Sequence, residues 1–198
     1  MPKEWSEWIT SWCSCAPQSD KPRVLLVGDS ITQGYQTEVR KSLDGVAYVD
    51  HIATSYAIDS KIYNTLIENF AADSDYAIVH FNHGLHGIHI SARTYKSRMK
   101  KLLGKLGKKS KIILANTTLV YEGGNRKRHA KWMKRVHERN EVVKELCAEY
   151  GYALDDLYSV SLAIDKTCRD EDGTHYLAAG YQTLASSVVE SIKNAIKN

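Results

Sequence analysis

Apolar runs and amphipathic segments alternate along most of this chain. From residue 23 onward, short continuous runs of apolar residues, as found in buried strands, are separated by segments in which apolar residues recur at helical spacing. The runs predict strands over residues 23–27, 46–52, 76–81, 111–115 and 152–154. The amphipathic segments predict helices over residues 35–43, 59–70, 91–106, 126–150 and 177–196.

This repeated strand–helix pattern predicts an α/β protein with a mostly parallel sheet. Helices on both faces of such a sheet give three layers. Right-handed crossovers and about five strands favour a flavodoxin-like order, 2-1-3-4-5, in which the first and third strands are neighbours. The chain of 198 residues is long enough for one domain, which we expect over residues 22–198.

Residues 1–21 differ from the rest because three of the four tryptophans lie there. Trp5, Trp8, Ile9 and Trp12 fall at helical spacing, which predicts a short helix or an arm packed on the domain's own surface. A dimer contact and an aromatic platform for a sugar are the alternatives. The sequence at 16–20 is typical of a linker.

A Gly-Asp-Ser sequence follows the first predicted strand, and a polar turn that can open a helix comes next. Ser30 is thus expected just past the carboxyl end of a strand, where open α/β sheets bind their ligands. The nearby helix N-terminus offers unpaired N–H groups to a developing negative charge. A nucleophilic serine also needs a base, a group that orients the base, and an oxyanion donor.

Two further segments supply these groups. The loop after the third strand begins with Asn82, and a late segment holds Asp172 and His175 just before the last helix. A separation of three residues would place Asp172 and His175 on one side of a helical turn, as base catalysis by imidazole requires. Asp170 and Glu171 are rivals at less suitable offsets. All three segments are expected at the same edge of the sheet.

Together these segments resemble the SGNH (GDSL) hydrolases, from about residue 23 to the final helix. The resemblance makes Ser30 the nucleophile, His175 the base and Asp172 the partner of the base. It also assigns the oxyanion hole to the N–H of Ser30 and the amide of Asn82. The Asn-x-Gly-Leu-His sequence at 82–86 resembles a subgroup that includes many carbohydrate esterases.

One family feature is missing, because no glycine follows the second predicted strand. A backbone N–H of Ser55 or Tyr56 is the expected substitute for the glycine N–H in the oxyanion hole. The residues expected to contact substrate are Asp29, His83, Gly84 and His86. Since Thr32 stands where a Gly-x-Ser-x-Gly elbow needs glycine, the sequence does not fit an α/β-hydrolase.

We therefore expect a serine esterase that hydrolyses short-chain esters, with an O-acetyl group on a carbohydrate as the favoured substrate. The resemblance implies no cofactor. A lysophospholipase or thioesterase on the same fold is one alternative. A non-catalytic relative that binds a sugar or a polyanion is the other, and the missing glycine favours it.

Histidines and cysteines suggest a metal site only weakly. His80, His83, His86 and His89 lie close in sequence, but metal sites usually add a carboxylate or thiol partner, so we expect no metal. The four cysteines fit neither a disulfide framework nor a zinc pattern and are read as reduced thiols.

The net charge of +4 and the pI near 8.7 are only mildly basic. Residues 96–111 hold eight Lys or Arg and residues 126–139 hold seven, and solvated outer helix faces explain both sets. We therefore expect no nucleic-acid partner. No apolar run approaches the roughly 20 residues of a membrane span, and no signal peptide is visible, so we expect a cytoplasmic location. The oligomeric state stays open.

Overall fold

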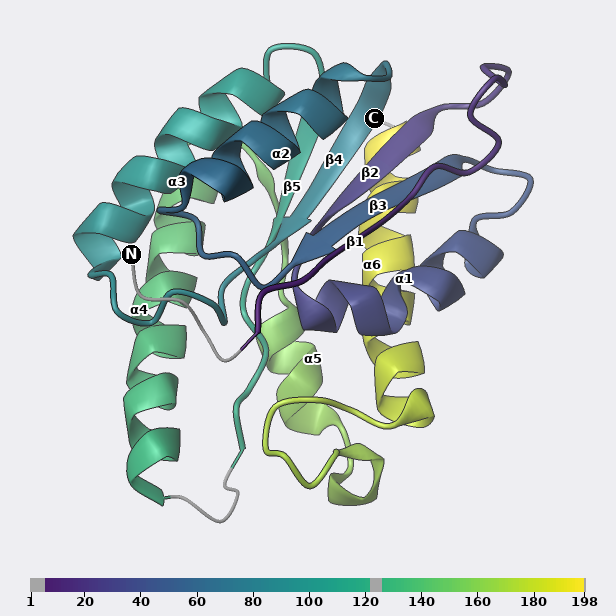
Figure 1. Cartoon of the computed structure of the whole chain (residues 1–198). Coiled ribbons are helices and arrows are strands. Elements are labelled where there is room, and N and C mark those ends of the chain that lie inside the picture. The colour runs from purple at the N-terminus through teal and green to yellow at the C-terminus, as the bar shows by residue number, and fades with distance from the viewer. Residues whose placement is uncertain (1–5, 122–125, 198) are drawn as a thin grey trace.

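Within residues 6–121 and 126–197, which the computed structural model describes, six strands form one sheet (Figure 1). They are β1 (Ile9–Trp12), β2 (Arg23–Gly28), β3 (Tyr48–Thr54), β4 (Tyr76–Asn82), β5 (Lys111–Ala115) and β6 (Ala153–Asp155). Their order is β1-β3-β2-β4-β5-β6, and only the β1–β3 pair is antiparallel. The predicted order of parallel strands is confirmed, with one added edge strand.

The helices follow the strands as the periodicity predicted. They are α1 (Ser30–Ser42), α2 (Lys61–Ala72), α3 (Ala92–Leu106), α4 (Arg126–Tyr150), α5 (Leu157–Ala163) and α6 (Ala178–Lys197), with a 3-10 turn at Lys166–Cys168. Helix α1 begins five residues before the predicted 35–43 segment, because Asp29 caps it by accepting the N–H of Ile31. Helix α5 was not predicted, since its short span carries little periodic signal.

Helices cover both faces of the sheet, as predicted. Helices α1 and α6 lie on one face, and α2, α3 and α4 lie on the other (Figure 1). Side chains of β2 alternate between them: Leu26 belongs to the core under α1 and α6, whereas Leu25 and Val27 belong to the opposite core. This double burial explains why the strands read as continuous apolar runs.

The N-terminal segment is an arm with a strand, and the alternative of a helix is wrong. Strand β1 pairs with the free edge of β3 and so satisfies backbone groups that this edge would leave open. Trp8 is half-buried, while Trp12 is 53% exposed beneath the guanidinium of Arg40. Trp5 lies outside the described residues.

A buried ion pair fixes the arm to the sheet. Arg23 donates to Asp50 at 2.9 Å, and the hydroxyl of Tyr76 donates to the same carboxylate at 2.9 Å. The guanidinium of Arg23 also donates to the carbonyl oxygens of Ser14 and Gln18, each at 2.9 Å. The arm thus runs along β3 as β1 and is then tied down at the amino edge of the sheet.

None of the helices in the described part of the chain is both long and apolar enough to cross a lipid bilayer.

Candidate active site

Ser30 stands at the tight turn between β2 and α1. A side chain at Gly28 would place its Cβ only 1.9 Å from Oγ1 of Thr32 and 2.5 Å from the carbonyl oxygen of Asn82, so this turn requires glycine. Asp29 is the N-cap of α1, which makes Ser30 its first residue. The N–H of Ser30 therefore has no acceptor within the helix and is a potential donor to a ligand.

His175 lies between Ser30 and Asp172. Its Nε2 atom is 2.7 Å from Oγ of Ser30, and its Nδ1 atom is hydrogen-bonded to the Asp172 carboxylate. The pair lies in a turn rather than the predicted helical turn. Gly173 adopts φ of +82° there, and Asp172 accepts the N–H groups of Thr174 and His175.

The hydrogen bonds of Asp172 set its own charge and the tautomer of His175. Burial acts to raise the pKa of Asp172, but its bonds with His175 and Thr174 outweigh burial and hold that pKa below the ordinary value. Asp172 is therefore a carboxylate at neutral pH, and it accepts the proton on Nδ1 of His175. Nε2 is then left to accept the hydroxyl proton of Ser30, which is the arrangement of a base next to a nucleophile.

Asn82 lies beside this group at the end of β4, paired in register with Gly28 of β2. Its side chain is buried, and its amide Nδ2 donates weakly, at 3.4 Å, to the hydroxyl of Tyr35. That hydroxyl is also 3.0 Å from Oγ1 of Thr32. Helix α1 therefore orients the amide of Asn82 as well as carrying Ser30.

The loop after β3 supplies neither of its predicted donors in a free state. The N–H of Ser55 donates to the carbonyl oxygen of Trp8 at 3.3 Å, and the N–H of Tyr56 donates to Oγ1 of Thr54 at 3.2 Å. Oγ of Ser55 also bonds Glu7, at 2.8 Å. The N-terminal arm thus engages both the N–H and the side chain of Ser55.

Three of the four predicted substrate contacts are buried. Asp29 is 1% exposed and accepts backbone N–H groups, His83 is 2% exposed, and Gly84 is buried against Thr117. These three residues build the site from beneath, and contact with substrate stays a prediction for all four. His86 is half-buried, with its ring stacked near that of His83 at 5.9 Å.

His83 is a neutral core residue. Burial lowers its pKa well below the ordinary value, and the nearby charges of His86 and Arg139 act in the same direction. Its ring lies 4.5 Å from that of Tyr63, and neither ring nitrogen has a hydrogen-bond partner of good geometry within the described residues. Such a ring packs as an aromatic group and does not act as an acid or base.

A buried arginine beneath the site was missed. Arg139 was placed with the solvated basic residues of α4, yet it is 1% exposed. The sequence does indicate this burial, because Arg139 and Asn140 lie between Val136 and Val143 at the spacing of the apolar stripe that faces the core. Judged by its charge alone, Arg139 is assigned to the solvent-exposed face of α4, whereas it lies on the buried face.

The histidines near the loop have separate roles. His80 is buried against Asp155 at 2.9 Å, and His89 bonds Asp59 at 2.9 Å. Among the residues with described positions, no group of three His, Cys, Asp or Glu is arranged to hold a metal ion. All four cysteines are free thiols.

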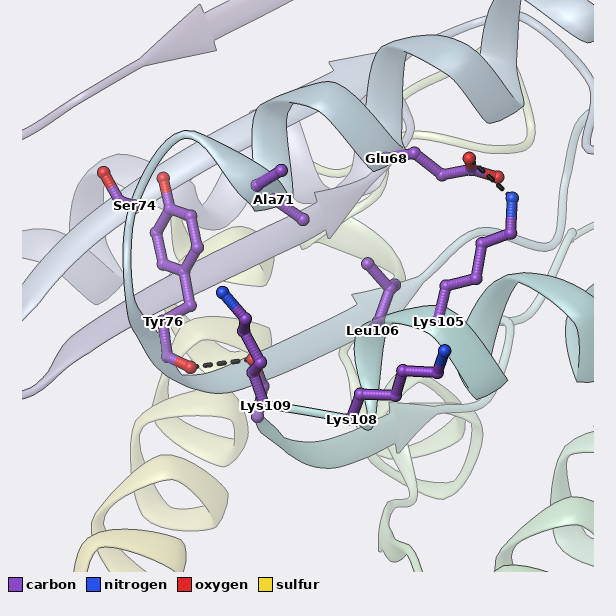
Figure 2. Close-up of a pocket in the computed structure, with 10 residues that line it drawn as sticks. Glu68, Ala71, Ser74, Tyr76, Lys105, Leu106, Lys108 and Lys109 are labelled. Atoms are coloured by element: carbon purple, nitrogen blue, oxygen red, sulfur yellow. Dashed lines mark hydrogen bonds and ion pairs between the residues drawn. The ribbon is translucent and has the colours of Figure 1, made fainter.

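A cavity of about 280 Å³ lies at the opposite, amino edge of β4 and β5 (Figure 2). Lys105, Lys108 and Lys109 surround it, and Lys105 pairs with Glu68 at 2.6 Å. These lysines stand at the last turn of α3 and just past it, where cations offset the negative end of a helix. The cavity is separate from Ser30, and helix electrostatics explain the lysines around it.

No protein-family model and no curated protein matches the sequence significantly, but solved structures match the fold. A candidate SGNH hydrolase from Slackia heliotrinireducens has a TM-score of 0.69 at 18% identity, over 87% of this chain and 100% of that one. A lipase/acylhydrolase from Enterococcus faecalis has a TM-score of 0.68 at 21% identity, over 87% and 96%. An acetylxylan esterase from Geobacillus stearothermophilus has a TM-score of 0.71 at 16% identity, over 86% and 94%. The chain therefore has the fold of the SGNH hydrolases.

Proposed function

We propose that the protein is a serine hydrolase that cleaves carboxylic esters at Ser30. The observation that carries this proposal is the hydrogen-bonded line from Asp172 through His175 to Ser30 at the carboxyl edge of the sheet. The line joins groups 145 positions apart in sequence, and it ends beside the amide of Asn82. Packing and stability do not require a serine, an imidazole and a carboxylate to be hydrogen-bonded in this order, whereas nucleophilic catalysis does.

The reaction follows from the geometry. His175 Nε2 takes the hydroxyl proton of Ser30 as Oγ bonds to the acyl carbon, and the carbonyl oxygen becomes an oxyanion. The N–H of Ser30 and the amide of Asn82 donate to that oxyanion. His175 then gives its proton to the departing alkoxide, which leaves an acyl-enzyme. Water attacks this ester with His175 as base, and release of the carboxylic acid restores Ser30.

The favoured substrate is an O-acetyl group on a carbohydrate. The Asn-x-Gly-Leu-His sequence at 82–86 supports this, since it resembles the carbohydrate-esterase subgroup. The likeness to the acetylxylan esterase supports an acetyl ester in the same way. Neither the mechanism nor the residues described require a cofactor.

Hydrolysis of p-nitrophenyl acetate by the pure protein and by Ser30→Ala tests the proposal. We expect turnover by the parent and a loss of at least about 10³-fold in Ser30→Ala, because the nucleophile is gone. Ser186→Ala is the matched control, since Ser186 is an exposed serine of α6. Near-parental turnover by Ser30→Ala, or no turnover by the parent on acetylated sugars as well, would refute the proposed function.

A further inference from the structure

The buried side chain of Arg139 binds three carbonyls of the loop that follows Asn82. Nη1 of Arg139 donates to the carbonyl oxygens of Gly84 and His86, and Nη2 donates to that of Gly87 at 2.5 Å. The guanidinium thus binds three carbonyls within four residues. A planar fork with five N–H groups suits this task, and an ammonium does not.

Tyr95 of α3 completes this arrangement. Its ring lies 4.9 Å from the guanidinium carbon of Arg139, a cation–π distance. Its hydroxyl donates to the carbonyl oxygen of His83 at 2.8 Å. Arg139 and Tyr95 therefore fix the carbonyls of the residues that directly follow Asn82.

The fixed carbonyls also orient the N–H groups of the loop. Every described peptide bond is trans, so each N–H points away from the carbonyl of its own peptide unit. With the carbonyl of Gly84 on Arg139, the N–H of Leu85 points the opposite way and donates to Oδ2 of Asp29 at 3.4 Å. The other oxygen of Asp29 accepts the N–H of Ile31 at 3.0 Å, in the turn that carries Ser30.

One peptide unit therefore lies between two buried opposite charges. Arg139 and Asp29 are each 1% exposed, and among the residues with described positions no carboxylate forms an ion pair with Arg139. The attraction between them acts through the Gly84–Leu85 peptide, whose dipole is aligned with it. This arrangement locks the loop after β4 against the turn after β2.

We propose that Arg139 is a positioning residue that sets the Asn82 side of the oxyanion hole against Ser30. It touches no substrate and acts through the loop at 83–87 and through Asp29. The effect on turnover rests on the proposed function, whereas the coupling of the loop to the Ser30 turn does not.

The variants Arg139→Lys and Arg139→Met test this role. Methionine removes the charge and all donors, and lysine keeps the charge without the fork. We expect kcat for p-nitrophenyl acetate to fall about 10²-fold in Arg139→Met and less in Arg139→Lys, with KM nearly unchanged, because a small misplacement of a catalytic group is costly. Arg135→Lys is the control, since Arg135 reaches the loop only at Ile88 and pairs with Glu138.

A double-mutant cycle separates positioning from general weakening of the fold. If Arg139 acts by placing Asn82, Arg139→Met should cost much less in the Asn82→Ala background than in the parent. The proposal would be overturned if Arg139→Met lowered kcat by the same factor in the parent and in Asn82→Ala, with the single and double variants both folded by circular dichroism at the assay temperature.

Hydrogen exchange gives a readout that does not need activity. In Arg139→Met we expect faster amide exchange in segment 83–87 and, with it, in the turn at 28–33, while Arg135→Lys exchanges like the parent in both segments. Tyr95→Phe, which loses only the bond to His83, should loosen the first segment to a smaller degree. Faster exchange at 83–87 with an unchanged turn at 28–33 would overturn the coupling, whether or not the parent hydrolyses esters.

Discussion

Asn82 brings a neutral donor to the end of β4, next to the turn that carries Ser30. An amide cannot be titrated in the working range, and it bonds a charged tetrahedral oxygen more strongly than a neutral carbonyl. In the proposed mechanism its importance is increased, because the N–H groups of Ser55 and Tyr56 both donate to acceptors within the protein.

Asn82→Ala should therefore lower kcat for p-nitrophenyl acetate by about 10²–10³ with little change in KM. Steady-state kinetics measure both constants. Asn69→Ala, on the exposed face of α2, is the control and should behave like the parent. If Asn82→Ala is indifferent, the amide does not bind the oxyanion and the assignment of this loop fails.

The buried, neutral ring of His83 should make the folded protein less stable in acid. Burial depresses its pKa in the folded protein, so below about pH 6.5 the unfolded chain binds more protons than the native state. The free energy of unfolding should fall as the pH falls through this range. His51 should contribute in the same direction, because burial lowers its pKa to about 4.

In His83→Gln, which cannot gain this proton, the decline should be shallower. Urea titrations between pH 7 and pH 5 measure it, with the exposed His137→Gln as control. An unchanged slope in His83→Gln would mean that the ring is protonated in the folded protein.

The site residues differ in how far the sequence reveals them. Ser30, Asp172 and His175 stand at the ends of strongly patterned elements, so their positions follow from the strand order. The roles of Asp29 and Arg139 depend on which way their side chains turn within buried layers. Residue type gave the wrong direction for Arg139, because charged groups are expected at the surface unless their buried partners are known.

At the scale of elements, the N-terminal arm is where periodicity misled most. Trp8 and Trp12 fit helical spacing, but the open edge of β3 gives the arm a row of backbone partners that no local pattern reports. The arm also reaches the site, since Trp8 accepts from Ser55 and Thr10 bonds Gln33 of α1 at 2.6 Å.

The anchor of the arm gives a stability prediction. Asp50→Ala leaves Arg23 buried without its carboxylate, and removal of one partner of a buried pair costs about 3–5 kcal/mol. Chemical denaturation should show this loss in the free energy of unfolding. Glu141→Ala breaks only the exposed pair with Lys144 and should cost within about 1 kcal/mol. Equal losses in both variants would show that the buried pair adds no more stability than an exposed one.

At the scale of the whole molecule, the order of parallel strands was predictable because right-handed crossovers leave few alternatives for a regular strand–helix alternation. The edge strand and α5 were not, since each is short and depends on tertiary partners. The same order brings the loops after β2 and β4 together with the segment before α6, which makes the site possible.

Acyl specificity belongs to this scale, because it depends on the space that several loops leave together. We expect kcat/KM to be highest for acetyl in a series of p-nitrophenyl esters. A pocket for longer chains would instead add about 0.8 kcal/mol of binding for each buried methylene. A steady rise from acetyl to octanoyl would favour a lysophospholipase or thioesterase.

The central claim is that Ser30 becomes acylated, and acid quenching during turnover of p-nitrophenyl acetate tests it most directly. Peptide mass mapping of the quenched protein should locate one acetyl group on the peptide that contains Ser30. The adduct should be absent from Ser30→Ala and should form far more slowly in His175→Ala, which lacks the base. An acetyl group on another residue, or the same adduct yield in His175→Ala, would contradict the account.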